Sequence, residues 1–142
     1  MSVRSAASRA TGPTVGLLAG TAAAGLGGLA AVAARDPHVP NSWGVCPLLA
    51  TTGVLCPGCG GLRAVADLAR GDVTAALSSN ALAVVLLAVA GLAWLVAAQG
   101  LVLRRAVPWE RWVTGRVAAV IIIALAAFSV LRNTPLADGL AP

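Results

Sequence analysis

Three long apolar runs without a charged residue are the feature that most constrains this chain. They extend from Thr14 to Ala34, from Val73 to Leu103 and from Val117 to Leu131, which is 21, 31 and 15 residues. A helix rises about 1.5 Å per residue, so 21 residues cover about 32 Å, and the hydrocarbon core of a bilayer is about 30 Å thick. The sequence therefore predicts an all-α integral membrane protein with about three transmembrane helices.

The composition agrees with this prediction and narrows the function. Charged residues make up 11% of the chain and hydrophobic residues 58%, whereas about a quarter of a soluble domain is charged. These proportions exclude a disordered chain and a large soluble enzyme domain. The five acidic residues and the one histidine form no acid–base pair or triad in the sequence, which favours a non-enzymatic protein.

Arginine supplies all ten basic residues, and its distribution predicts an orientation. Arg4 and Arg9 precede the first apolar run, and 104–116 holds four arginines against one glutamate, whereas three arginines between 35 and 79 face three aspartates. By the positive-inside rule, the N-terminus and 104–116 are cytoplasmic, so the loop after the first span is extracytoplasmic. The arginines form no stripe beside stacking aromatic residues, so no nucleic-acid partner is predicted.

The resulting division of the chain follows the apolar runs. It comprises a cytoplasmic tail (1–13), a first span (14–34), a Cys-rich loop (35–61), a short amphipathic interfacial helix with its connector (62–79), a second span (80–103), a basic connection (104–116), a third span (117–131) and a C-terminal tail (132–142).

The first span allows two further interpretations. Its end, Ala31-Val32-Ala33-Ala34, resembles a signal-peptide cleavage site, but the apolar stretch is longer than the roughly 7–15 residues of a signal peptide, which favours a retained helix. Small residues recur every fourth position along it, at Gly16, Gly20, Ala24 and Gly28. Such a stripe permits close helix approach, so we expect self-association or binding to other membrane-protein subunits through this helix.

All three cysteines and the histidine lie in the loop after the first span. Cys56 and Cys59 form a CxxC motif, with Cys46 ten residues upstream of Cys56. Three interpretations remain open: a reversible dithiol, a structural disulfide, and a zinc-type metal site with Cys46 as third ligand and His38 as fourth. A c-type haem is excluded because Gly60, not histidine, follows the motif.

At these residues the chain resembles a family of small bacterial membrane proteins, the domain-of-unknown-function family 2752. The resemblance runs from Cys46 to about Leu87, with Leu62 and Ala81 where the family usually has Thr and Pro, and Arg132-Asn133 resembles the family's closing element. The matching residues are Cys46, Pro47, Thr52, Gly53, Cys56, Pro57, Gly58, Cys59, Gly60, Arg63, Gly71, Asp72 and Asn80. The resemblance implies a multi-helix membrane architecture with a cysteine motif between the first spans, in which Arg63 acts together with the cysteines. No activity carries over from it.

Two functions follow from these observations. The first is an accessory or structural component of a membrane complex, because the soluble portion is small. The alternative is a thiol-redox or zinc-type metal-binding membrane protein that uses Cys46, Cys56 and Cys59.

Overall fold

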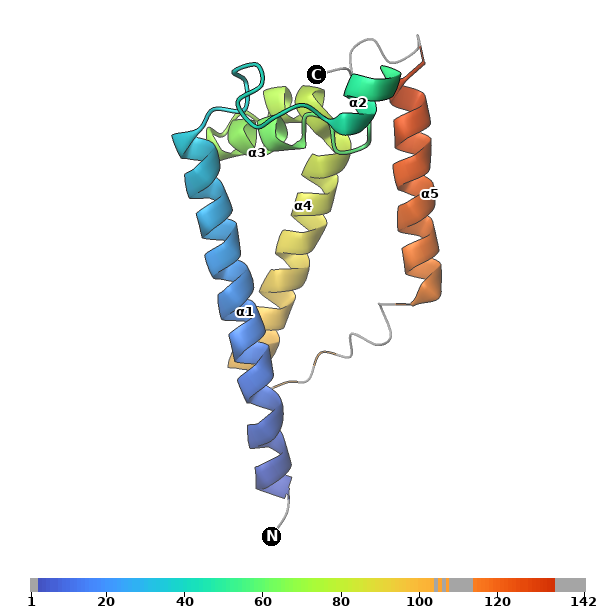
Figure 1. Ribbon diagram of the computed structural model, residues 1–142. Helices are drawn as coiled ribbons and strands as arrows, with labels where there is room; N and C mark the ends of the chain where they lie inside the picture. The colour runs from blue at the N-terminus through green and yellow to red at the C-terminus, as the bar shows by residue number, and fades with distance from the viewer. Residues whose placement is uncertain (1–2, 104, 106, 108–113, 135–142) are drawn as a thin grey trace.

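The computed structural model describes residues 3–103, 105, 107 and 114–134, with side chains described from residue 14 onward. These residues form five α-helices and no strand. The helices are α1 (Val3–Ala34), α2 (Pro47–Thr52), α3 (Gly61–Ala69), α4 (Val73–Val102) and α5 (Gly115–Arg132). The three long helices alternate in direction, and α2 and α3 lie near the ends that α1, α4 and α5 share (Figure 1). The predicted all-α architecture is confirmed.

Three helices are long and apolar enough to cross a membrane: Thr14–Ala34 within α1, Val73–Val102 and Gly115–Arg132. At most 6% of the apolar window in each is buried within the chain, so these side chains need a lipid environment to remove them from water. The three spans are therefore confirmed, although the helices are longer than expected. The α1 helix begins inside the expected N-terminal tail, and α4 begins inside the expected connector.

The α4 helix has two starts, each made by a polar side chain. The carboxylate of Asp72 accepts a hydrogen bond from the amide of Ala75 at 2.8 Å, which satisfies a first-turn donor. Eight residues after Asp72, Asn80 leaves the helical conformation, and its Oδ1 accepts from the amide of Ala83 at 2.9 Å. The helix is thus interrupted at Asn80, while the helix long and apolar enough to cross a membrane runs from Val73 to Val102; a start of the second span at residue 80 stays a prediction.

The α3 helix ends at Ala69, and two residues later Gly71 has a φ of 82°. Glycine is favoured at this left-handed position because a Cβ there is strained. The buried side of α3 carries Ala64, Ala66 and Asp67. Leu62 at the start of this helix is exposed, whereas Asp67 on the buried side is bound by His38 and Ser79 from other elements.

A tryptophan joins α4 to α1. The indole nitrogen of Trp94 donates to Thr21 Oγ1 at 3.2 Å. The glycines of the predicted stripe do not take part, since a Cβ added at Gly16, Gly20 or Gly28 would meet nothing within 4 Å. Association through that stripe remains a prediction. Most of the basic connection 104–116, the side chains of Arg4 and Arg9, and the C-terminal tail beyond Thr134 lie outside the described residues.

Candidate metal centre

Three cysteine sulfurs converge between α2 and the start of α3. Cys46, Cys56 and Cys59 place their Sγ atoms within 4.8 Å of one another. The Cys46–Cys56 separation is 3.5 Å and the Cys56–Cys59 separation is 3.0 Å. A disulfide has an S–S length of about 2.05 Å, and all three cysteines are free in this structure. The disulfide considered from the sequence is therefore not formed here.

Cys46 stands immediately before α2, a helix that the sequence did not predict in this Pro- and Gly-rich loop. Pro47 occupies the first helical position, where its missing N–H costs nothing. The backbone amide of Leu49 at the start of this turn is the main cause of a lowered pKa for the Cys46 thiol, and the Cys56 side chain adds to the effect. Cys46 therefore loses its proton more readily than an ordinary cysteine.

Cys59 has the opposite environment. It is buried, and burial raises the pKa of its thiol to about 12, with a further contribution from Cys56. Its amide donates to the carbonyl of Cys56 at 3.1 Å, which closes a turn through Pro57 and Gly58. Gly60 then adopts a φ of 78° and directs the chain into α3.

Three side chains from the ends of the spans hold this turn, and we call them the clamp: Asn80, Arg132 and Asn133. The amide nitrogen of Asn80 donates to the carbonyls of Pro57 and Cys59, both at 2.9 Å. Asn80 is 1% exposed, and the structure describes no unsatisfied buried side-chain polar atom. The position of the motif is thus fixed by hydrogen bonds to its backbone and not by packing alone.

The α5 half of the clamp was not predicted from the residues. The guanidinium of Arg132 is buried and donates to the carbonyls of Cys59 at 2.6 Å and Ser79 at 3.1 Å. Asn133 pairs with Leu55 in both directions, accepting from its amide at 2.8 Å and donating to its carbonyl at 2.9 Å. The signal in the sequence was the position of Arg132-Asn133 directly after an apolar run.

Arg63, one helical turn before Asp67 on α3, is hydrogen-bonded to the loop after α1 and not to Asp67. Its Nε donates to the carbonyl of Pro37 at 3.2 Å, in the loop that follows α1. The described arginine hydrogen-bonded to the backbone of the motif is Arg132, while Arg63 lines the same cavity as Cys46 and Cys59; joint action of Arg63 with the cysteines stays a prediction.

His38 does not lie with the three cysteine sulfurs. Its Nδ1 contacts Asp36 at 3.0 Å and its Nε2 contacts Asp67 at 3.1 Å. The amide and ring of His38, with a smaller contribution from Arg70, lower the pKa of Asp36 to about 2. Asp67 also accepts from Ser79 at 2.9 Å. In this geometry both ring nitrogens of His38 face carboxylates, and its role as a fourth ligand stays a prediction.

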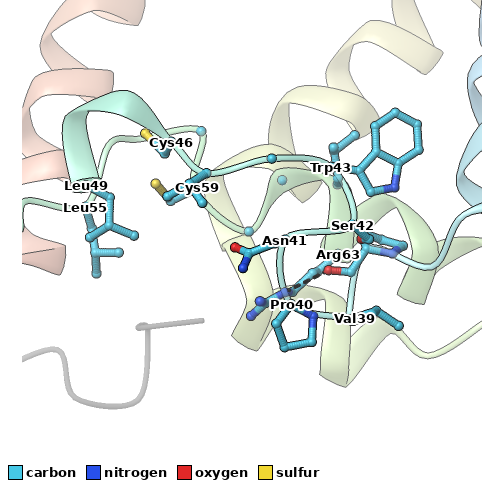
Figure 2. Close-up of a pocket in the computed structure, with 17 residues that line it drawn as sticks. Val39, Pro40, Asn41, Ser42, Trp43, Cys46, Leu49, Leu55, Cys59 and Arg63 are labelled. Atoms are coloured by element: carbon cyan, nitrogen blue, oxygen red, sulfur yellow. Dashed lines mark hydrogen bonds between the residues drawn. The ribbon is translucent and has the colours of Figure 1, made fainter. Parts of the chain in front are cut away.

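A cavity of about 400 Å³ opens beside the sulfur cluster, between the loop after α1 and the start of α3. Figure 2 shows Cys46 and Cys59 at one side of this cavity, with Trp43 and Arg63 at the other. The cluster is therefore accessible from the cavity and is not sealed within the loop.

The donor set suits a thiophilic metal ion. With Zn–S bonds of about 2.3 Å in a tetrahedron, neighbouring sulfurs are about 3.8 Å apart, which lies between the 3.0 Å and 4.8 Å observed here. Within the described part of the chain, no other His, Cys, Asp or Glu joins the group.

The fold and this site define a small helical membrane protein with a three-thiol cluster at one end of its spans. Residues 46–94 match the family described as protein of unknown function (DUF2752). The resemblance seen in the motif is confirmed over this segment, which contains the three cysteines and Asn80 but ends before Arg132. Comparison with curated proteins and with solved structures gives no match.

Proposed function

We propose that this protein binds a zinc-type, thiophilic metal ion through Cys46, Cys56 and Cys59. One observation carries the proposal: three free sulfurs lie within 4.8 Å of one another although ten residues and a helix separate Cys46 from Cys56. A purely structural disulfide uses two cysteines, whereas thiolate coordination uses all three.

The charge around the cluster supports binding. Three thiolates around a divalent cation carry a net charge of −1, and the guanidinium of Arg132 is hydrogen-bonded to the carbonyl of Cys59. A nearby positive charge favours the thiolate form that metal binding requires. Three protein ligands leave one position open, as in zinc sites that exchange or activate a ligand.

We place this site on the extracytoplasmic side of a bacterial inner membrane. The distribution of arginine supports that orientation. The site-bearing ends of α1, α4 and α5 also lie together (Figure 1), as three alternating passes require. Labelling of intact cells with a membrane-impermeant thiol reagent tests the orientation, and labelling only after lysis contradicts it.

Elemental analysis of the full chain, purified in detergent under reducing conditions, tests the metal site. We expect about one zinc-type ion per chain, and loss of most of it in Cys46→Ser, Cys56→Ser and Cys59→Ser. Thr51→Ser is the matched control, because it lies in the same loop on α2 and keeps a hydroxyl. A metal-free protein contradicts the proposal, and if it shows one titratable thiol after the reductant is removed and the protein is exposed to air, the result favours a Cys56–Cys59 redox pair.

A role as an accessory component of a membrane complex is the second candidate. The observation in its favour is the exposed apolar surface of the spans, together with the stripe at Gly16, Gly20 and Gly28, which meets no other side chain in the described chain. Purification from native membranes in mild detergent tests it, and recovery as a lone monomer contradicts it.

A further inference from the structure

The cavity beside the sulfur cluster is lined by thiol, guanidinium, amide, aromatic and aliphatic side chains. Its walls include Cys46, Cys59, Arg63, Trp43, Asn41 and Leu49, and Figure 2 shows these side chains around one space. At about 400 Å³ it is within the range of small-molecule sites. Both Cys46 and Cys59 line it, so a molecule in the cavity reaches the metal ligands directly.

Arg63 gives this cavity its charge. Among the lining residues it is the one arginine, and no aspartate or glutamate lines the space. Its Nε is held by the carbonyl of Pro37 at 3.2 Å, and for its two terminal nitrogens the structure describes neither a hydrogen bond nor an ion pair. Asp67, one turn further along α3, is bound by His38 and Ser79 instead. A guanidinium held at one nitrogen still offers donors that suit a carboxylate.

The metal site lacks a fourth ligand from the described chain. The cluster consists of three cysteines, and no further metal-binding side chain of the described residues is within reach. A tetrahedral zinc-type ion therefore takes its fourth ligand from outside, either water or a molecule in the adjacent cavity. Thiolate is the ligand type that a soft-ligand site favours.

We propose that the cavity binds a small thiol that carries a carboxylate, with its sulfur completing the metal coordination and its carboxylate bound by Arg63. This inference rests on the proposed metal site. On binding, the thiol releases its proton to solvent, a metal–sulfur bond forms and a metal-bound water leaves. No electron is transferred in this exchange.

The test uses the full chain in detergent micelles, loaded with Co²⁺ as a spectroscopic substitute for zinc. The probes are 3-mercaptopropionate, 2-mercaptoethanol and propionate, which carry both groups, the thiol alone and the carboxylate alone. The visible bands of thiolate-bound Co²⁺ report each titration, and elemental analysis confirms that the metal remains bound. We expect 3-mercaptopropionate to bind about 10- to 100-fold more tightly than 2-mercaptoethanol, as a charged hydrogen-bonded pair provides.

Arg63→Gln should abolish that preference without reducing the Co²⁺ content. Arg70→Gln is the matched control, because this arginine of the α3 C-cap contacts Asp36 and does not line the cavity. If Arg63→Gln fails to fold, the affinities of the three probes for the parent protein and for Arg63→Lys test the inference.

Three outcomes overturn the inference in distinguishable ways. Equal affinity for the two thiols, or a preference that survives Arg63→Gln, overturns it while leaving the metal site intact. Propionate binding as tightly as 3-mercaptopropionate shows that the fourth ligand is not a thiol. A chain that takes up no Co²⁺ refutes the metal site and this inference together.

Discussion

Replacing Asn80 by serine is expected to release the CxxC turn from the spans. Serine keeps a hydroxyl oxygen to cap the helix at the amide of Ala83, but its side chain is too short to reach the carbonyls that Asn80 binds. The carbonyl of Pro57 then loses its described donor, whereas that of Cys59 keeps Arg132. The substitution therefore removes the hydrogen bonds by which Asn80 holds the turn and keeps its cap on the helix.

The cost follows from these two carbonyls. An unsatisfied buried acceptor costs about 1–3 kcal/mol, and a lost hydrogen bond whose acceptor keeps another donor costs about 0.5–1.5 kcal/mol. We expect Asn80→Ser to favour the open turn by about 2–4 kcal/mol, or about 30- to 700-fold in the opening equilibrium. Asn80→Ala should add about 1 kcal/mol for the lost cap.

Alkylation of Cys59 in detergent measures this opening. In a Cys46→Ser, Cys56→Ser background Cys59 is the one remaining thiol. Cys59 lines the cavity but has little exposed surface, so a polyethylene-glycol maleimide too bulky to enter the cavity labels it only when the turn opens. A low concentration of this uncharged maleimide keeps labelling slower than reclosing, so the rate follows the opening equilibrium.

Thr114→Ala is the control for destabilisation elsewhere in the chain. It removes the cap that Val117 uses at the opposite end of α5 and should leave the labelling of Cys59 within about threefold of the parent. If Asn80→Ser, with its helical content intact, also labels within threefold of the parent, the clamp does not hold the turn and the reasoning is refuted.

Two further predictions concern the flanks of the site. Gly60→Ala should lower the free energy of unfolding by about 1–2 kcal/mol, because Gly60 has a φ of 78°. Gly58→Ala is the control, since a Cβ at Gly58 meets Cys56 Sγ at an ordinary 3.8 Å. Thermal unfolding of both variants checks the prediction, and equal losses of stability contradict it. The pKa of Asp36 is lowered to about 2 from 3.8, so its contribution to holding the loop is complete above about pH 4 and is lost as the pH falls toward 2. Pepsin cleavage of residues 36–45 should therefore be faster in Asp36→Asn than in the parent at pH 4 and equal near pH 2, and equal rates at both pH values would count against this assignment.

The features that the sequence predicted well depend on neighbouring residues. The spans follow from uninterrupted apolar runs, and the break before the second span follows from Gly71, Asp72 and Asn80, each of which acts on amides within one helical turn. Short-range rules of this kind apply before any tertiary contact is known. The six-residue α2 escaped prediction because Pro47 and Gly53 bound a segment too short for helical periodicity.

The features that the sequence missed depend on distant residues. Asp67 lies four residues after Arg63, a spacing that suits an ion pair on a helix, but the structure shows it in contact with His38, 29 positions earlier. Arg132 contacts the carbonyl of Cys59 across 73 residues. An arginine at the end of an apolar helix also fits an interfacial position, so its burial could be found only from the arrangement of the helices.

The division of the clamp between two spans gives the site an order of assembly during synthesis. Asn80 follows the cysteines by about twenty residues, so the first part of the clamp is available as soon as the second span enters the membrane. Arg132 and Asn133 come about fifty residues later, which at about 5–20 residues per second is a delay of about 3–10 s. During that interval the three thiols are already made but lack the contacts from α5. A ribosome that stalls between the second and third spans therefore leaves a nascent chain with its cysteines only partly held in place.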